Sequence, residues 1–181
     1  DLIKAKKESF TKDFENPKRK IDILKDANSL YQFIHSYKDT EPSIDIETFK
    51  CIPSCIAICF TPWHTGVIPL LPIAGVGGEL RLTTIEYVHI WQVLSEFLND
   101  PRIKLVGQNV KFDLEKLIAP AKLLHPFVRN KVAADTSMMM GVLYPELPRK
   151  LEFSTSIFTN EPFYKDEGKE FHPKKDPPER L

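Results

Sequence analysis

Hydrophobic and acidic side chains alternate in a short run of this sequence, residues 43–48, which reads Ser-Ile-Asp-Ile-Glu-Thr. Side chains two positions apart in a β-strand point to the same face of a sheet. A strand here therefore presents Asp45 and Glu47 together on one face, and Ile44 and Ile46 on the other. Two carboxylates that close raise each other's pKa, so a protein that keeps both ionised usually places a cation between them. The run predicts a β-strand with a candidate metal site on its polar face.

A third carboxylate follows a second strand-like run, residues 103–107. Asp113 comes on the first turn of the helix expected next, one turn beyond Asn109 and on its face. This order of elements brings Asp113 toward Asp45 and Glu47. Mg²⁺ prefers carboxylate oxygens and keeps several waters, and two such ions roughly 3.5–4 Å apart can activate an attacking water and stabilise the leaving oxygen. The acids therefore predict a divalent-metal site that hydrolyses phosphodiesters without a protein nucleophile.

Each piece of this pattern also has a simpler interpretation. An Asp-x-Glu pair on an amphipathic strand is, by itself, more often a solvated face than a metal site. An Asn-x-x-x-Asp spacing on a helix is even weaker evidence for a metal site. The order of the pieces favours the metal interpretation: a strand with paired acids, a hairpin and a helix, and then a strand that leads into the Asn and Asp helix.

The remaining elements follow from capping residues, helix breakers and alternation. Asp26 can cap a helix that ends before Glu41-Pro42. Thr83 and Glu86 form a capping box that opens another helix, with Trp91 expected in the core. The other predicted elements are strands at residues 55–60, 66–70 and 128–134, a helix end at Asn99-Asp100-Pro101, and a helix between Asp135 and Pro145.

These motifs resemble the proofreading 3′–5′ exonuclease domain of family A DNA polymerases, in the DEDD exonuclease superfamily on the ribonuclease H-like fold. Residues 43–48 are similar to the first motif of that family. Residues 106–113, Val-Gly-Gln-Asn-Val-Lys-Phe-Asp, are similar to the second over eight consecutive positions. Residues 134–139 resemble an Asp-Thr-Met stretch that follows. The resemblance covers about residues 20 to 160 and implies an α/β fold, a mixed sheet with an antiparallel three-strand meander and flanking helices.

The resemblance also implies roles for individual residues. Asp45 would bridge two metal ions, Mg²⁺ or Mn²⁺, when the site is complete. Glu47 would bind the first ion and orient the nucleophilic water, and Asp113 would bind the second. The residues that would seat the terminal nucleotides are Thr48, Gln108, Asn109 and Phe112.

The sequence departs from the family at the third motif, Tyr-x-x-x-Asp, which supplies a fourth carboxylate and a water-placing tyrosine. Tyr164 is followed four residues later by Gly168, and Tyr144 by Pro148. Residues 172–176, His-Pro-Lys-Lys-Asp, have one residue too few, and their proline opposes the required helix. We therefore expect a fragment truncated before this motif, or one half of a split protein, with weak or no activity alone.

The leading functional prediction is a proofreading module that removes 3′ terminal nucleotides of DNA. Its expected partners are the 3′ end of single-stranded DNA and either a polymerase domain or a missing C-terminal segment. The alternative is a non-catalytic domain on the same fold that binds single-stranded nucleic acid or serves as a scaffold. An RNA-directed exonuclease of the same superfamily is a further option, because the acids treat DNA and RNA alike.

Composition sets the broad class. Of 181 residues, 42% are hydrophobic and 28% charged, and the formal net charge is zero. Such a chain has no general basic field for duplex binding, which an enzyme that grips a few nucleotides does not need. No apolar run is long enough to cross a membrane, so we expect a soluble, intracellular, cytoplasmic chain without a membrane partner. We expect a charged arm or linker at 1–20, an exonuclease-like domain at 21–160 and a Pro-rich, charged tail at 161–181.

Three cysteines, Cys51, Cys55 and Cys59, recur every four residues. In a strand this spacing separates neighbouring thiols by about 13 Å, too far to share one ion. We expect reduced thiols in a core-facing strand.

Other chemistry-bearing residues also have two interpretations. Trp63, at a turn, either folds back on the sheet or stacks on a base, and the adjacent His64 is either structural or a general base. Asp135 either caps the helix that follows it or ligates a metal from a strand end. Residues 138–140, Met-Met-Met, are expected to fill gaps in the core.

Overall fold

The computed structural model of this chain describes residues 19–38, 41–71, 82–123 and 130–159. These residues fall into two compact units, 19–135 and 136–159. Several expectations concern segments outside the described residues: most of the predicted arm, the tail and the imitations of the third motif at Tyr164 and at residues 172–176.

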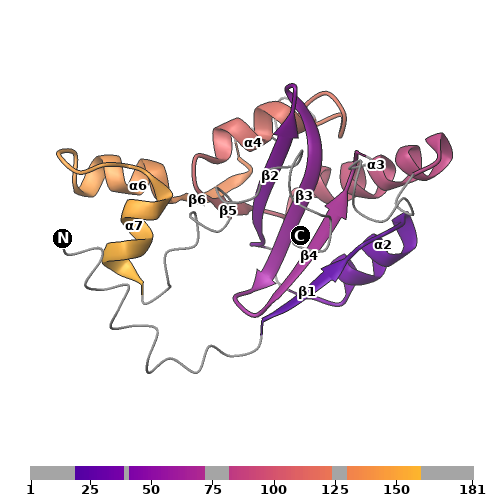
Figure 1. Cartoon of the computed structure of the whole chain (residues 1–181), viewed down its shortest axis with the longest axis horizontal. Coiled ribbons are helices and arrows are strands. Elements are labelled where there is room, and N and C mark those ends of the chain that lie inside the picture. The colour runs from indigo at the N-terminus through magenta and orange to yellow at the C-terminus, as the bar shows by residue number, and fades with distance from the viewer. Residues whose placement is uncertain (1–18, 39–40, 72–81, 124–129, 160–181) are drawn as a thin grey trace, which may run out of the picture. The chain divides into compact units, whose positions relative to one another are not determined.

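A mixed sheet of six strands forms the framework of the first unit, in the order β1-β4-β3-β2-β5-β6 (Figure 1). β2, β3 and β4 form an antiparallel meander, whereas β1 runs parallel to β4, and β5 runs parallel to β2 and β6. The predicted mixed sheet with its three-strand meander is confirmed. The strands are β1 (Lys20–Ile23), β2 (Ser43–Phe49), β3 (Ile52–Thr61), β4 (His64–Pro69), β5 (Leu105–Gly107) and β6 (Val132–Asp135).

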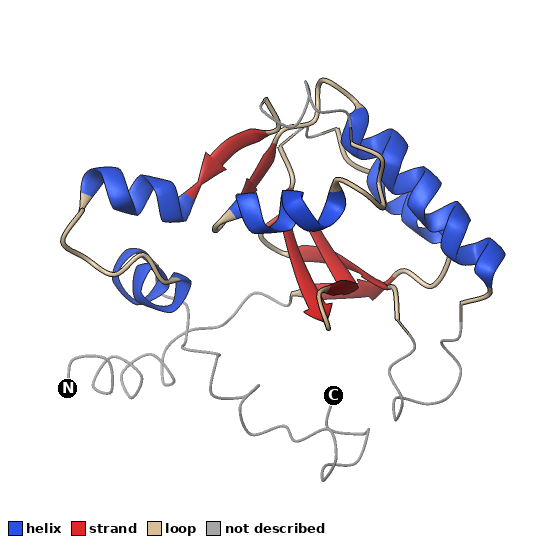
Figure 2. Cartoon of the chain, turned by 90° about the horizontal axis from the view of Figure 1, so that it is seen from above, coloured by secondary structure: helices blue, strands red, loops and turns tan. Residues whose placement is uncertain are grey.

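The helices of this unit, which are among the blue ribbons of Figure 2, begin where the sequence predicts. They are α2 (Ala27–His35), α3 (Thr84–Asn99) and α4 (Val110–Leu117). Asp26 caps α2 in a capping box with Ser29, and Thr83 does the same for α3 with Glu86. Each box satisfies N–H groups at the helix start that have no partner inside the helix.

Alternate residues of the sheet and one side of each helix supply the core. The sheet side is dominated by β-branched isoleucines, which suit a pleated, half-buried surface. Burying each such side chain contributes roughly 1.5–3 kcal/mol. Trp91 is 7% exposed, as expected for a core residue. Core residues include Ile44, Ile46, Ile56, Ile58 and Ile68 from the sheet, and Leu30, Ile90, Leu94, Leu98, Val110, Leu114 and Leu117 from the helices.

The cysteines do not face this core, contrary to the prediction. Cys51 is exposed, and Cys55 and Cys59 are only partly buried on β3. The reason is the period of two along β3. The set that contains Ile56, Ile58 and Phe60 buries more apolar surface than the set that contains the thiols, so it takes the core face.

The second unit consists of α6 (Thr136–Leu143) and α7 (Leu151–Phe158). The predicted helix after Asp135 is confirmed as α6, whereas α7 was not predicted. The expectation that all of residues 138–140 fill a core is wrong, because Met140 is 5% exposed but Met138 is 65% exposed. Consecutive residues lie about 100° apart around a helix, so three in a row cannot share one face.

No helix in the described part of the chain is long and apolar enough to cross a membrane. The longest of them, α3, has 16 residues, whereas a membrane-spanning helix needs about 20 apolar ones.

Candidate functional site

β2 lies inside the sheet, between β3 and β5, and carries the two acids predicted to bind metal. Ile44 and Ile46 are 3% and 5% exposed, whereas Asp45 and Glu47 are exposed. The alternation of residues 43–48 thus has the orientation that the sequence predicts, with the isoleucines in the core and the carboxylates outside it.

Asp113 meets this strand from α4. Its side chain is 4% exposed, and its Oδ1 accepts a hydrogen bond of 3.1 Å from the backbone N–H of Ile46. Ile46 is the residue between Asp45 and Glu47, so the bond fixes the third acid against the backbone that carries the other two. The structure therefore brings Asp113 to β2 across 67 positions of sequence.

The surroundings of Asp113 raise its pKa to about 6. Burial is the largest cause, because it disfavours the charged form, and the negative charge of Asp45 is the next. The charge of Asp135 adds to the effect, and hydrogen bonds from backbone N–H groups oppose it. Asp113 and Asp45 are thus close enough for their negative charges to repel each other.

Residues before α4 fix the position of this helix. A Cβ at Gly107 would lie 2.9 Å from Val110 Cγ2, so β5 and α4 approach too closely for a larger residue. Asn109 then adopts a left-handed conformation with φ 60°, which asparagine tolerates better than most residues. The carboxylate of Asp135 accepts hydrogen bonds from the N–H groups of Asn109 (3.0 Å) and Val110 (2.9 Å).

Sequence reasoning missed this role of Asp135, for which it considered capping of the helix that follows in the chain and metal binding. Asp135 lies opposite Gly107 on the neighbouring parallel strand, so its carboxylate reaches the start of α4. Unpaired N–H groups and the positive end of the dipole make a helix start favourable for a carboxylate. An acid at the end of a parallel strand was the available signal, but it did not indicate which helix it would bind.

The residues predicted to seat nucleotides come from two neighbouring segments. Thr48 follows Glu47 on β2, at a β-bulge, an irregularity that often re-aims side chains near functional sites. Gln108 and Asn109 form the turn before α4. Phe112, on α4, is 40% exposed, and the Lys116 amine lies 5.3 Å from the centre of its ring.

Cys55 is a neighbour of the acids that sequence reasoning did not include. It lies opposite Glu47 in the β2–β3 register. Burial raises the pKa of its thiol, and the charges of Glu47 and then Asp45 raise it further. The neutral, protonated thiol is therefore favoured, and the negative charges of Glu47 and Asp45 act on it.

The donor atoms suit a hard cation, but they are not assembled into a complete site. Asp45, Glu47 and Asp113 offer carboxylate oxygens of the kind that Mg²⁺ and Mn²⁺ bind. Within residues 19–38, 41–71, 82–123 and 130–159, however, no group of three or more His, Cys, Asp or Glu side chains is arranged to hold a metal ion. The two-ion site therefore stays a prediction.

His64 is held by two polar side chains. Its Nε2 lies 2.7 Å from Asp22 Oδ2, and its Nδ1 bonds to the Tyr37 hydroxyl, so it joins β1, β4 and the end of α2. Trp63 is 48% exposed at the turn between β3 and β4.

No family model and no curated protein sequence matches this chain. Solved structures do. The Nibbler EXO domain of Aedes aegypti aligns with a TM-score of 0.59 at 10% identity, covering 87% of this chain and 76% of that one. The catalytic core of RRP6 from Trypanosoma brucei aligns with a TM-score of 0.57 at 16% identity, covering 98% of this chain and 48% of that one. Trypanosoma brucei RNase D has a TM-score of 0.49 at 13% identity, with 69% and 41% covered.

At these identities the comparison concerns the fold. The two structures with the higher TM-scores are an EXO domain and a catalytic core, and neither identifies a family A polymerase. This chain spans less than half the length of the RRP6 core. Its six-stranded mixed sheet, with the meander and the helices described above, is the ribonuclease H-like exonuclease fold.

Proposed function

We propose that this chain is a 3′–5′ exonuclease module that hydrolyses terminal nucleotides of a single strand with the help of divalent metal ions. The hydrogen bond from Ile46 N–H to Asp113 Oδ1 carries the proposal, because it brings the third predicted acid onto the strand of Asp45 and Glu47. The exonuclease fold supports it.

Asp45, Glu47 and Asp113 would hold Mg²⁺ or Mn²⁺, which supplies hydroxide near neutral pH and stabilises the leaving oxygen. The chain itself must then position the substrate. The exposed ring of Phe112 offers a stacking surface for a base, an interaction worth about 1–3 kcal/mol. The amine of Lys116, above the same ring, offers a positive charge to a phosphate.

The finer assignment, a proofreading module attached to a DNA polymerase, rests on the Gly-Gln-Asn-Val-Lys-Phe-Asp resemblance at residues 107–113. It assigns the 3′ end of DNA as substrate and a polymerase as partner. Residues that would contact a 2′-hydroxyl are not identifiable from this sequence, so cleavage of DNA and RNA strands of the same base sequence must be compared directly.

A second candidate is a non-catalytic domain that binds single-stranded nucleic acid. One observation favours it: no three acids are grouped for metal binding in the part of the chain that the structure describes. In this case the exposed Phe112 and its neighbours would bind a strand without cutting it.

The decisive experiment uses the whole chain with 5′-labelled single strands of DNA and RNA, with Mg²⁺, with Mn²⁺ and with EDTA. A metal-dependent ladder of shortened products that Asp45→Asn and Asp113→Asn abolish supports the exonuclease. Glu115→Gln is the matched control, because it removes an acid from the exposed side of α4, where Glu115 pairs with Lys111 at 3.7 Å.

Strand binding is measured on the same samples by fluorescence anisotropy. Cleavage that survives Asp45→Asn contradicts the assigned site. Strand binding that ignores EDTA, together with no cleavage, favours the non-catalytic candidate. A preference for DNA over RNA supports the proofreading assignment, and the opposite preference contradicts it.

A further inference from the structure

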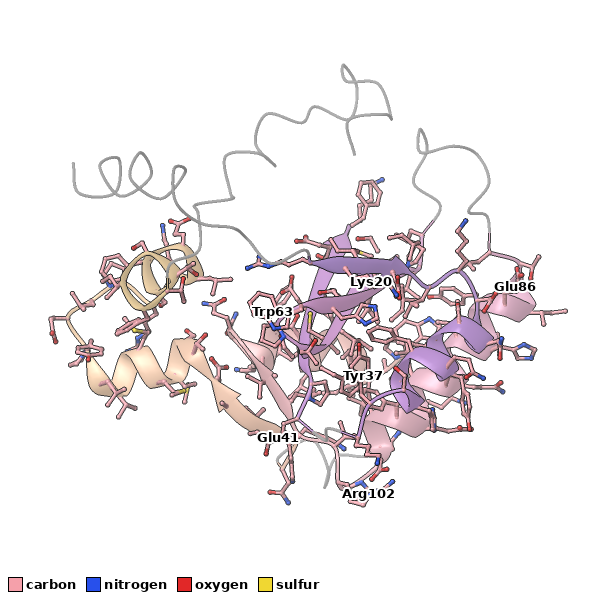
Figure 3. The ribbon with its side chains drawn as sticks, turned by 90° about the horizontal axis from the view of Figure 1, so that it is seen from below. Lys20, Tyr37, Glu41, Trp63, Glu86 and Arg102 are labelled. Carbon is pink, nitrogen blue, oxygen red and sulfur yellow. The ribbon has the colours of Figure 1, made fainter. Side chains whose placement is uncertain are left out.

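Among the residues that the structure describes, β1 forms one edge of the sheet and pairs with β4 alone. It pairs in parallel with β4, with Lys20 opposite His64 and Ile23 opposite Val67. The backbone N–H of Lys20 donates to Trp63, at the same end of the sheet (Figure 3), and that of Leu24 donates to Val67, both at 2.8 Å.

Backbone groups of alternate residues in a strand point to opposite sides. Since Lys20 and Leu24 bond toward β4, the N–H and C=O groups of Ile21 and Ile23 point outward. In the described part of the chain, no hydrogen bond reaches these outward groups. Their side chains are 65% and 48% exposed. An edge with free backbone groups and exposed isoleucines is a template for another strand.

We propose that this edge binds the same edge of a second copy of the chain, antiparallel and centred on Ile21. The two-fold axis would place Ile21 opposite its own counterpart, and this pair would exchange both backbone hydrogen bonds. The two sheets would join into one across the axis.

The charges of β1 favour this register. Centring on Ile21 puts Lys20 of each copy opposite Asp22 of the other, so two ion pairs flank the axis. Lys20 already bonds to its own Asp22 at 2.9 Å, and both side chains reach solvent, so exchange to the partner needs no burial of charge. Centring on Asp22 instead would place two carboxylates opposite each other, which is unfavourable.

The edge is short, so the association is weak and depends on concentration and salt. Stable interfaces bury about 1,600 Å² in total, more than a four-residue strand supplies. We therefore expect a reversible monomer–dimer equilibrium in sedimentation velocity, visible only at high protein concentration and shifted toward monomer by salt, which screens the flanking ion pairs.

Ile21→Lys tests the axis, because it places two like charges opposite each other. We expect at least a tenfold weaker dimer. Ile85→Lys is the matched control, since Ile85 is 67% exposed and belongs to helix α3 and not to a strand. Circular dichroism verifies that both variants fold. A dimer that Ile21→Lys leaves unchanged contradicts the proposal.

Charge exchange tests the register. Lys20→Glu alone and Asp22→Lys alone each put like charges across the axis, and each should be monomeric. Mixed together, they present opposite charges at both positions, and a heterodimer should return. A chain that is monomeric at every accessible concentration overturns the proposal. The edge would then be a binding site for an extended segment of a different protein. Failure to restore a heterodimer overturns the register.

Discussion

The tripeptide Ile-Asp-Ile occurs twice in one sheet, at residues 21–23 of β1 and 44–46 of β2, and the sheet treats the two in opposite ways. In β2 the isoleucines are buried and Asp45 is exposed. In β1 the isoleucines are exposed, and Asp22 bonds to His64. The same alternation therefore does not say which of its two faces enters the core.

The difference comes from what surrounds each strand. β2 has a strand on both sides, and its isoleucines belong to the core that α4 shares. Within the described segments, β1 has β4 as its one neighbouring strand, and Asp22 bonds to His64 and Lys20. A central strand gains most by burying its apolar side, whereas an edge strand can place a paired acid toward its neighbours.

The largest expected effect is on the cleavage rate, and it separates Asp45 of β2 from Asp22 of β1. Asp45→Asn should lower the rate of nucleotide release about 10²–10⁴-fold, because metal stabilisation of the transition state is worth several kcal/mol. Asp22→Asn should change it less than about twofold, since no site contact involves Asp22. Single-turnover cleavage of a labelled strand measures both. Equal losses would break the contrast between the strands and count against the assigned site.

The next largest effect is expected on stability, from truncating a buried isoleucine of β2 compared with an exposed isoleucine of β1. Ile46→Ala should lower the free energy of unfolding by about 2–5 kcal/mol, because it leaves a cavity in the core. Ile21→Ala should change it by no more than about 0.5 kcal/mol, because that side chain is 65% exposed. Urea titrations followed by circular dichroism compare the two. A large loss for Ile21→Ala would mean that β1 is covered, which also speaks against the proposed edge contact.

Asp113 should lower the free energy of unfolding as the pH rises. Its pKa of about 6 in the folded protein lies above the value of about 3.9 for an unfolded chain. The folded state therefore holds this proton more tightly. The stabilisation is full below about pH 3.9 and is lost as the pH rises through about 6.

Asp113→Asn removes this dependence, and the amide oxygen can still accept from Ile46 N–H. In EDTA at about pH 8 the variant should be more stable than the parent by up to about 3 kcal/mol, and the gain should vanish near pH 4. Unfolding titrations across this range check it. A gain that is independent of pH would show that the charge of Asp113 is not the cause.

Asp22, in β1, should have the opposite slope. The bonds from Lys20 and then His64 lower its pKa, so its stabilisation is present above the unfolded pKa and is lost as the pH falls through the folded one. Asp22→Asn should therefore weaken the protein at neutral pH and matter less in acid. If the contributions of Asp22 and Asp113 to the free energy of unfolding changed in the same direction with pH, the opposite pKa shifts assigned to them would be wrong.

The smallest effect on stability is expected from Asp135, whose carboxylate holds the start of α4. Asp135→Ala removes two hydrogen bonds to the helix start and should lower the free energy of unfolding by about 1 kcal/mol. Cleavage should fall as well, because Asp113 would lose its fixed approach to Ile46. Comparing Asp135→Ala with Asp135→Asn separates loss of the bonds from loss of charge. Unchanged stability in both would show that Gly107 and the core alone hold α4.

Patterns contained within a few residues were predictable from the sequence. The capping boxes at Asp26 and Thr83, the alternation in β2 and the turn that separates β3 from β4 each depend on neighbours along the chain. The motif spacing also predicted that Asp113 reaches β2. The candidate acids were identified from local sequence and resemblance, whereas the raised pKa of Asp113 depends on burial and on Asp45, which is distant in sequence.

Choices between faces and partners were decided only by the tertiary structure. The side of β3 that takes the thiols, the exposure of the isoleucines in β1 and the helix that Asp135 binds all depend on competition for the same buried surface or the same unpaired N–H groups. That competition is settled by residues far apart in the chain. A short sequence thus specified the strands and the acids, and packing specified which way each strand turns and what holds the acids in place.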